Sequence, residues 1–258
     1  MSILATNRIF RPLLVPTLTV LVALPILIGL GTWQVQRLHW KQGLIADLEA
    51  RMAADPIAFP PQADWSIADW QALAFRTVSV EGRYLNEHEF HVFRQNQDGD
   101  AAYRLVTPLK LNAGGYVFVD RGFVPAPFKD PALRPDSRRE GEVEVVGLVR
   151  APEEEGYFDV VQNAESNEWT RRMPATFAEV ADLAPVAPYL IEAEREEPKT
   201  VGLPIAEPAP LNIRNNHLEY AITWFSLAVG LVAVYLAYHI ANGRVGPPRP
   251  SRSGRRSA

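Results

Sequence analysis

Two long apolar segments enclose a polar middle region in this chain of 258 residues. The first covers residues 12–33 and contains no charged side chain, and the second covers residues 218–240. Because about 20 apolar residues span the roughly 30 Å hydrocarbon core of a bilayer, each segment has the length of one membrane crossing. Pro16 and Pro25 would break a soluble helix, but membrane helices tolerate proline. The pattern predicts transmembrane helices over residues 12–34 and 218–240.

A cleaved signal peptide is the alternative interpretation of the first segment, because the leader before it is short and contains basic residues. The segment is longer than the apolar core of a typical signal peptide. It is also not followed by a small-x-small cleavage site, for which residues 31–33 (Gly-Thr-Trp) are a poor substitute. We therefore predict an uncleaved signal anchor.

Basic residues near the two segments indicate their orientation, because cytoplasmic flanks carry an excess of Lys and Arg. The leader has Arg8 and Arg11, and residues 244–258 hold five arginines and no acid. Without those five charges the net charge of −4 becomes −9, which does not suggest a nucleic-acid binder. We expect a bacterial inner-membrane protein with cytoplasmic termini and a periplasmic domain. The expected boundaries are 1–11 and 241–258 for the termini and 35–213 for the domain.

Short runs that alternate between apolar and polar residues fill the middle region. This period of two is typical of strands, and the close spacing of the runs indicates an antiparallel sheet closing toward a small barrel or sandwich. Helical periodicity continues over residues 43–54, and a short helix is expected within residues 168–182. The fold class is therefore an α+β membrane protein, with two transmembrane helices flanking an antiparallel β-rich, barrel-like extracytoplasmic domain. The expected strands cover residues 76–82, 90–94, 103–107, 109–111, 116–120, 142–149 and 189–193, with hairpin loops at 96–100 and 112–115.

Two clusters of acidic residues interrupt this region. One is residues 153–155, and the other comprises Glu192, Glu194, Glu196 and Glu197. Because charged side chains are seldom buried without a partner, we expect both clusters to form solvated faces.

The sequence contains no motif of a known enzyme class and no cysteine, so thiolate chemistry and disulfides are excluded. His88 and His91 fall in an expected strand, which would place them on opposite faces, so they are not expected to bind a metal as a pair. His217 and His239 lie at opposite ends of the second apolar segment, roughly 33 Å apart along a helix. These two histidines cannot bind the same iron.

His217 stands where the polar region passes into the second apolar segment. Histidine at such a place is usually a cap or an interface residue, but ionisable groups at a membrane boundary also mark functional sites. Tyr220 and Trp224 follow on the same helical face and could flank a flat macrocycle. Histidine is a common axial ligand of haem, and Arg37, after the first helix, could meet the propionates. Metal ligation by His217 and ordinary interface packing both remain open on this reasoning.

Three segments carry a resemblance to a known family. They are GTWQVQRLHWK at residues 31–41, VDRGFVP at 119–125 and NNHLEYAITWF at 215–225. In this order, and with two flanking membrane spans, they resemble the Surfeit locus protein family of cytochrome c oxidase assembly factors. The resemblance covers about residues 12–240. It implies an assembly factor that acts on the haem a-containing subunit of a terminal oxidase.

The resemblance also implies haem a as a transient cofactor, with His217 as its ligand, and haem a synthase as a further candidate partner beside the oxidase subunit and the lipid bilayer. The family commonly has Asn before the Arg-Gly pair and Trp after it, where this chain has Asp120 and Phe123. We expect both differences to be mild. Two functions stay open: a haem a chaperone, and a scaffold without haem that stabilises assembly intermediates. A catalytic role in haem handling would need redox or acid–base groups that the sequence does not single out.

Overall fold

The computed structural model describes residues 10–95, 99–153, 166–206 and 213–245. The chain divides into two compact units, one formed by Met1–Ile45 with Asn212–Ala258 and the other by Ala46–Leu211. Part of the predicted loop at 96–100, most of the acidic residues 153–155, Arg8 and most of the basic tail lie outside the described residues.

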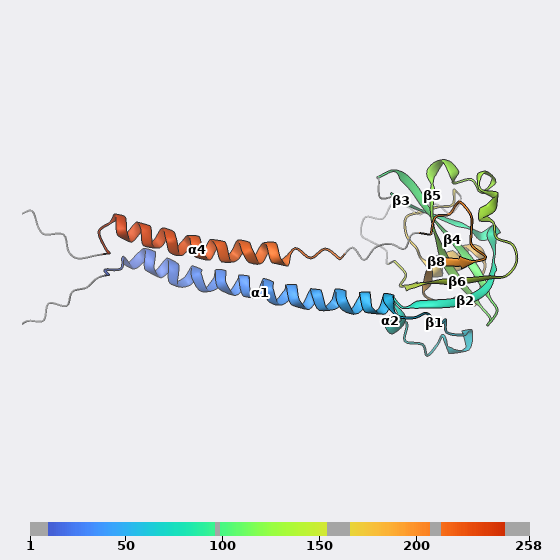
Figure 1. Ribbon diagram of the computed structural model, residues 1–258, viewed down its shortest axis with the longest axis horizontal. Helices are drawn as coiled ribbons and strands as arrows, with labels where there is room; N and C mark the ends of the chain where they lie inside the picture. Colours follow the sequence, from blue (N-terminus) through green and yellow to red (C-terminus); the bar gives the residue numbers. More distant parts are fainter. Residues whose placement is uncertain (1–9, 96–98, 154–165, 207–212, 246–258) are drawn as a thin grey trace, which may run out of the picture. The chain divides into compact units, whose positions relative to one another are not determined.

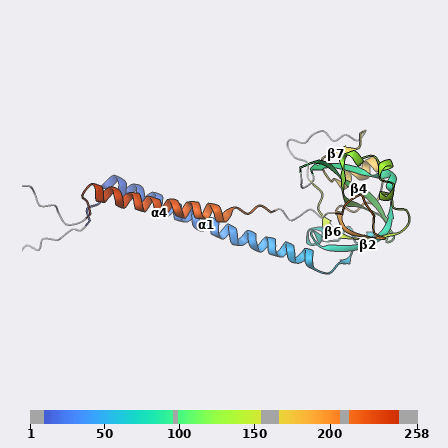
Figure 2. The same cartoon turned by 45° about the horizontal axis from the view of Figure 1, so that its top comes forward.

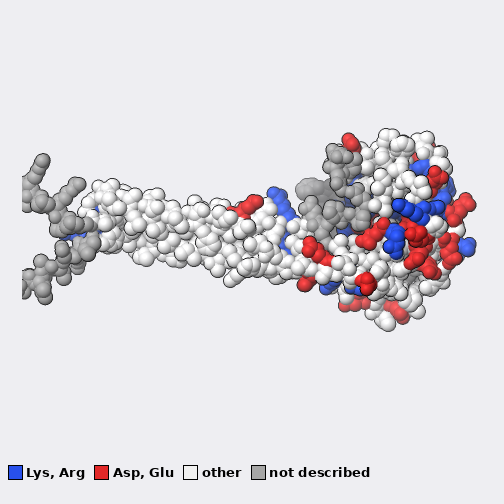
Figure 3. Space-filling view, in the orientation of Figure 1, with Lys and Arg blue, Asp and Glu red and all other residues white. Residues whose placement is uncertain are grey.

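The first unit contains one long helix and most of a second. Helix α1 is Leu14–Ala53 and helix α4 is His217–Ala241, and both are long and apolar enough to cross a membrane. They lie side by side in both ribbon views (Figures 1 and 2). On the face that Figure 3 shows, the apolar part of this pair is almost free of charge, and charged side chains appear only toward the later part of α1 and the start of α4. Pro25 lies inside α1 without interrupting it, and the predicted continuation over residues 43–54 is confirmed because α1 ends at Ala53.

The two helices run antiparallel and contact each other along the length of α4, the shorter of the two. Near one end, the hydroxyl groups of Thr17 and Tyr235 are 2.8 Å apart. Toward the other end, Gly31 allows the ring of Phe225 to approach so closely that a Cβ atom on Gly31 would lie 2.8 Å from it. A side chain on residue 31 would therefore force the Phe225 ring or the helices to shift where they meet.

The second unit is built on a closed five-stranded barrel, which confirms the predicted barrel-like domain. Around the ring the strand order is β2–β6–β8–β5–β4, and β4 pairs again with β2. Four of these five pairings among the described residues are antiparallel, as predicted, whereas β5 and β8 run parallel. The strands are β1 Ile57–Ala58, β2 Thr77–Tyr84, β3 Phe90–Gln95, β4 Ala101–Leu111, β5 Tyr116–Pro125, β6 Val143–Arg150, β7 Glu168–Trp169 and β8 Leu190–Glu197.

Successive residues of each strand point to opposite faces, so the barrel wall has two apolar layers. The inner layer fills the barrel and includes Val78, Leu109, Val119, Val145 and Ile191. The outer layer lies under helix α3 (Pro174–Ala181), the short helix predicted within residues 168–182, and under β3 and β7. Its buried residues include Phe90, Val106, Phe118, Trp169 and Phe177.

Candidate functional site

His217 is the first residue of α4, at the point where a polar segment gives way to an apolar helix. An α-helix repeats every 3.6 residues, so His217, Ala221 and Ala228 project from one side of α4. Ala221 and Ala228 are buried within the helix pair, which identifies this side as the face toward α1. His217 is half-buried on that same face. The histidine therefore points between the two helices instead of standing as an isolated cap.

The partner of His217 is Gln34 of α1. The Nδ1 atom of His217 lies 2.7 Å from the Oε1 atom of Gln34, whose residue is only 8% exposed. A carbonyl oxygen can only accept a hydrogen bond, so Nδ1 carries the hydrogen in this arrangement. The Nε2 atom then keeps its lone pair, and in the described part of the chain it has no hydrogen-bond partner. This is the form of imidazole that binds a metal through Nε2.

The polar segment before α4 is also tied to α1. The Nζ atom of Lys41 donates a hydrogen bond to the carbonyl oxygen of Arg214. Next to it, the Oδ1 atom of Asn215 is buried and has no hydrogen-bond partner among the described residues. A buried acceptor without a partner costs about 1–3 kcal/mol. The Asn215 side-chain oxygen is therefore an acceptor that the packing of the helix pair leaves without a donor.

The other residues predicted for the site are less closely joined. Tyr220 and Trp224 follow His217 on α4; Tyr220 is 55% exposed and Trp224 is half-buried. The guanidinium of the exposed Arg37 lies 4.6 Å from the centre of the Trp40 ring. The structure thus brings His217 together with Gln34, which the sequence reasoning had not proposed as a site residue, and leaves Arg37 on the surface of α1.

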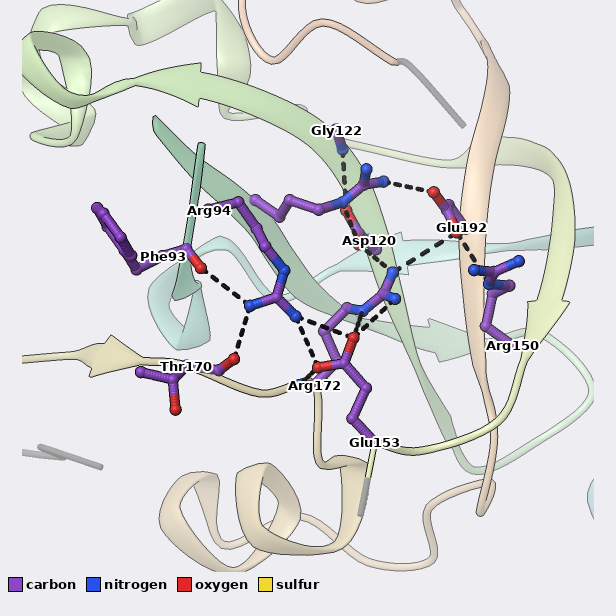
Figure 4. A network of polar contacts seen from close by, with 10 residues as sticks. Phe93, Arg94, Asp120, Gly122, Arg150, Glu153, Thr170, Arg172 and Glu192 are labelled. Carbon is purple, nitrogen blue, oxygen red and sulfur yellow. Dashed lines mark hydrogen bonds and ion pairs between the residues drawn. The ribbon is translucent and has the colours of Figure 1, made fainter. Parts of the chain in front are cut away.

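A buried ion network occupies the outer face of the barrel in the second unit (Figure 4). The Oδ2 atom of Asp120 is 2.5 Å from the Nε atom of Arg104 and 2.9 Å from the Nη1 atom of Arg172. Glu192, opposite Asp120 on the parallel strand, is 2.9 Å from Arg104 and 3.1 Å from Arg150. Two neighbouring carboxylates therefore share a set of guanidinium groups. Loss of any one partner would leave a buried charge uncompensated.

Glu153 extends this network toward the domain surface. It binds Arg172 at 2.9 Å and both of its oxygens accept hydrogen bonds from Arg94. Burial raises the pKa of the Glu153 carboxyl, but Arg172 and Arg94 outweigh it and hold that pKa below its ordinary value. The expectation that Glu153 and Glu192 lie on solvated faces is wrong, because their charges are matched by arginines distant in the sequence.

A second network lies on the inner face, one residue along β5. Arg121 is 1% exposed, and its Nε atom is 2.8 Å from Glu196. The hydroxyl of Tyr84 donates to the same carboxylate at 2.8 Å, and the Arg121 guanidinium lies 4.3 Å from the centre of the Tyr84 ring. Burial, followed by the charge of Glu196, raises the pKa of Tyr84. Glu196 is thus a third acid that was expected on a solvated face, and it is buried.

Gly122 completes this segment of β5. Its φ is +112°, and a Cβ atom there would lie 2.0 Å from the carbonyl oxygen of Ile205. Phe123 and Ile205 exchange two backbone hydrogen bonds of 2.9 Å beside it. Only glycine combines this backbone conformation with so close an approach of a second chain segment.

The sequence matches a family model that covers most of the chain. The model is described as the SURF1 family and matches residues 21–229. The chain belongs to the SURF1 family. Members of this family are cytochrome c oxidase assembly factors, so membership implies interaction with oxidase components. The resemblance inferred from the three motifs is confirmed.

Individual SURF1 relatives agree with this assignment. "Surfeit locus protein 1" of Homo sapiens is 33% identical over 227 residues, which cover 81% of this chain and 73% of the human protein. "SURF1-like protein" of Monosiga brevicollis is 32% identical over 246 residues, covering 89% of this chain and 92% of the relative. "SURF1-like protein" of Drosophila melanogaster is 30% identical over 218 residues, which cover 78% of this chain and 69% of the Drosophila protein. These three proteins are named by their family, and none of the names states an enzymatic activity.

Each of the three motifs that suggested the SURF1 family has a defined structural position. Residues 31–41 supply Gln34 and the close contact at Gly31. Residues 119–125 carry Asp120 and Arg121, the centres of two buried networks. Residues 215–225 place His217 opposite Gln34. The motifs therefore correspond to the helix pair and to the barrel wall, and the histidine belongs to the helix pair.

Proposed function

We propose that this SURF1 protein binds haem a through His217 and hands it to the haem a-containing subunit of cytochrome c oxidase during assembly. The observation that carries the proposal is the hydrogen bond between Nδ1 of His217 and Gln34, which leaves Nε2 as an available ligand. Haem a in this setting is a cargo whose redox chemistry belongs to the finished oxidase. The chain's own task is to hold it, and no catalytic step is assigned to any residue.

The donor set fits a haem better than a bare metal ion. Among the described residues there is no group of three or more His, Cys, Asp or Glu side chains that could hold a metal. A bare zinc ion needs about four protein ligands, whereas a porphyrin already supplies four nitrogens and needs only an axial residue. A single half-buried histidine is sufficient for that axial position.

The surrounding side chains suit the remaining parts of such a ligand. Tyr220 and Trp224 continue the helix face that begins at His217, where aromatic rings can pack against a flat macrocycle. Arg37 keeps an exposed guanidinium near the end of the apolar part of α1, where it can pair with a propionate. We place both termini in the cytoplasm of a bacterium and residues 35–213 in the periplasm, on the strength of the basic flanks. Haem a synthase is a further candidate partner, because it makes this cargo.

The experiment is to purify the full chain in detergent after co-expression with the enzymes of haem a synthesis and to record its visible spectrum and pyridine haemochrome. His217→Ala is the test variant, and His39→Ala, an exposed histidine on α1, is the matched control. We expect haem a in the wild type and in His39→Ala, and its loss in His217→Ala. Thermal unfolding of each variant checks that the fold is unchanged.

The alternative function is a scaffold that stabilises assembly intermediates through protein contacts without haem. A wild-type protein that stays colourless under these conditions would favour the scaffold and overturn the proposal. Equal haem content in the wild type and in His217→Ala would place the ligand at another residue.

A further inference from the structure

We infer that Gln34 is the positioning residue of this site: its amide oxygen fixes His217 in the Nδ1–H tautomer and aims Nε2 before any cofactor arrives. The inference rests on the proposed function for its purpose, but the tautomer itself is a property of the protein without ligand. Gln34 does not contact the cargo in this assignment. It acts only through His217.

The first support is the burial of Gln34 within the helix pair. It is one of the two buried residues of α1, and the other is Gly31, one turn earlier. An amide removed from water is destabilising unless it is hydrogen-bonded, so an amide on this face needs a partner. The bond of 2.7 Å to His217 supplies one. The pairing therefore accounts for a polar side chain on the face of α1 that meets α4.

The second support is the close helix contact next to this pair. The ring of Phe225 sits where any side chain on residue 31 would collide with it. Phe225 is two turns beyond His217 on α4, and Gly31 is one turn before Gln34 on α1. Because this contact limits how α4 can rotate or slide against α1, it also fixes the distance between Gln34 and His217. The geometry of the hydrogen bond is thus held by packing and not by the two polar side chains alone.

The chemistry follows from what each amide atom can do. The oxygen of Gln34 accepts the Nδ1 hydrogen, which selects the tautomer with a lone pair on Nε2. Without that acceptor, neutral imidazole is free to carry its hydrogen on Nε2, where it would block a metal. Such partners of ligating histidines typically contribute about 10–100-fold to metal affinity. Gln34 should therefore matter for affinity while leaving the fold intact.

The test uses the full chain, purified without haem, with ¹⁵N-labelled histidine and in alkaline buffer, and reads the His217 tautomer from its imidazole ¹⁵N shifts. We expect the Nδ1–H form in the wild type and in Gln36→Leu, an exposed amide on the same helix. Gln34→Leu should shift the population toward the Nε2–H form, and Gln34→Glu, which keeps an oxygen acceptor, should restore the wild-type form. Unchanged thermal unfolding in these variants excludes a general loss of packing.

The haem measurement is kept separate from this result. Haem affinity should fall about 10–100-fold in Gln34→Leu and recover in Gln34→Glu. An Nε2–H tautomer in the wild type, or an unchanged tautomer in Gln34→Leu, would overturn the inference. If the tautomers behave as expected but no variant binds haem, the positioning of His217 by Gln34 stands and the proposed function fails.

Discussion

Asp120 and Arg121 are consecutive residues of β5 whose charged groups are buried on opposite faces of the barrel wall. Asp120 meets Arg104 and Arg172 on the outer face, and Arg121 meets Glu196 on the inner face. One strand thus joins two ion networks that do not share a side chain in these contacts. Changes at these two positions should therefore act on different layers of the same domain.

Replacement of Asp120 by asparagine should destabilise the domain by about 3–5 kcal/mol, because it removes one partner from a buried group of charges. Arg104 and Arg172 would keep their charges with one carboxylate fewer to balance them. Urea unfolding of the full chain, followed by tryptophan fluorescence, measures the change. Asp64→Asn, at an exposed aspartate, is the control and should leave the midpoint unchanged. Equal midpoints for the two variants would show that the Asp120 charge contributes nothing.

Replacement of Gly122 by alanine should destabilise the domain more than the same change at Gly141. Both glycines have a positive φ, +112° and +89°, which costs an alanine about 1–3 kcal/mol at either position. Only at Gly122 would the new Cβ also collide with the backbone of Ile205. The difference between the two unfolding free energies isolates that collision. A difference of zero would contradict the close approach of residue 205.

Acid should weaken the domain through carboxylates whose pKa values are low in the folded state. Burial raises the pKa of Glu153, but Arg172 and Arg94 outweigh it and the net shift is downward. Arg121 lowers the pKa of Glu196 in the same way, against the effect of its burial. Between the folded and the unfolded pKa values, the unfolded chain binds more protons than the folded chain. The free energy of unfolding therefore rises with pH in this range.

The stabilisation from these groups is therefore complete above the unfolded pKa of about 4.3 and is lost as the pH falls through the lower folded values. Urea unfolding of the full chain at a series of pH values below 6 measures this slope. Glu153→Gln should flatten it, whereas Glu87→Gln, at an exposed glutamate, should not. A slope that is identical in all three proteins would remove Glu153 from the explanation.

Replacement of Gly31 by leucine should disturb the helix pair, because even a Cβ atom at this position would lie 2.8 Å from the Phe225 ring. The expected result is a lower thermal unfolding temperature and, under the proposed function, weaker haem binding, since Gln34 and His217 depend on the same helix contact. Phe225→Ala should partly restore both in the double variant by removing the colliding ring. Gly43→Leu is the control, because a Cβ there would meet no atom within 4 Å. Additive effects of the two changes would argue against direct contact.

The sequence alone predicted the elements whose signal is local. The apolar runs identify α1 and α4, and alternation identifies most strands of the barrel, since both patterns repeat within a few residues. Two acids of β8, Glu192 and Glu196, were misplaced for the opposite reason, whereas Glu194 and Glu197 are exposed as predicted. Glu192 looks like part of a solvated cluster, because its partner Arg104 is 88 residues away in the chain. A buried ion pair cannot be distinguished from a surface charge until the strands are assembled.

The candidate site was predicted in part. His217 stands out in the sequence because an ionisable group at the start of an apolar segment can mark a functional site. Gln34 does not stand out, because it lies among other polar residues at the end of an apolar run and 183 positions from its partner. Arg37 was predicted as a neighbour from its place after the first apolar segment, because the contacts across 183 positions of sequence could not be read. Position along the helix was visible in the sequence, but the side of α1 that faces α4 was not.

The barrel cannot close without β8, which is its last strand in the sequence. Strand β8 inserts between β5 and β6, and until residues 190–197 have been synthesised neither Glu192 nor Glu196 is present to meet Arg104 and Arg121. Arg104 and Arg121 therefore lack these two partners in any chain that ends before β8. A chain terminated before β8 would therefore keep helix α1 but could not close the barrel. Such a product would be a substrate for proteolysis and not a shorter working protein.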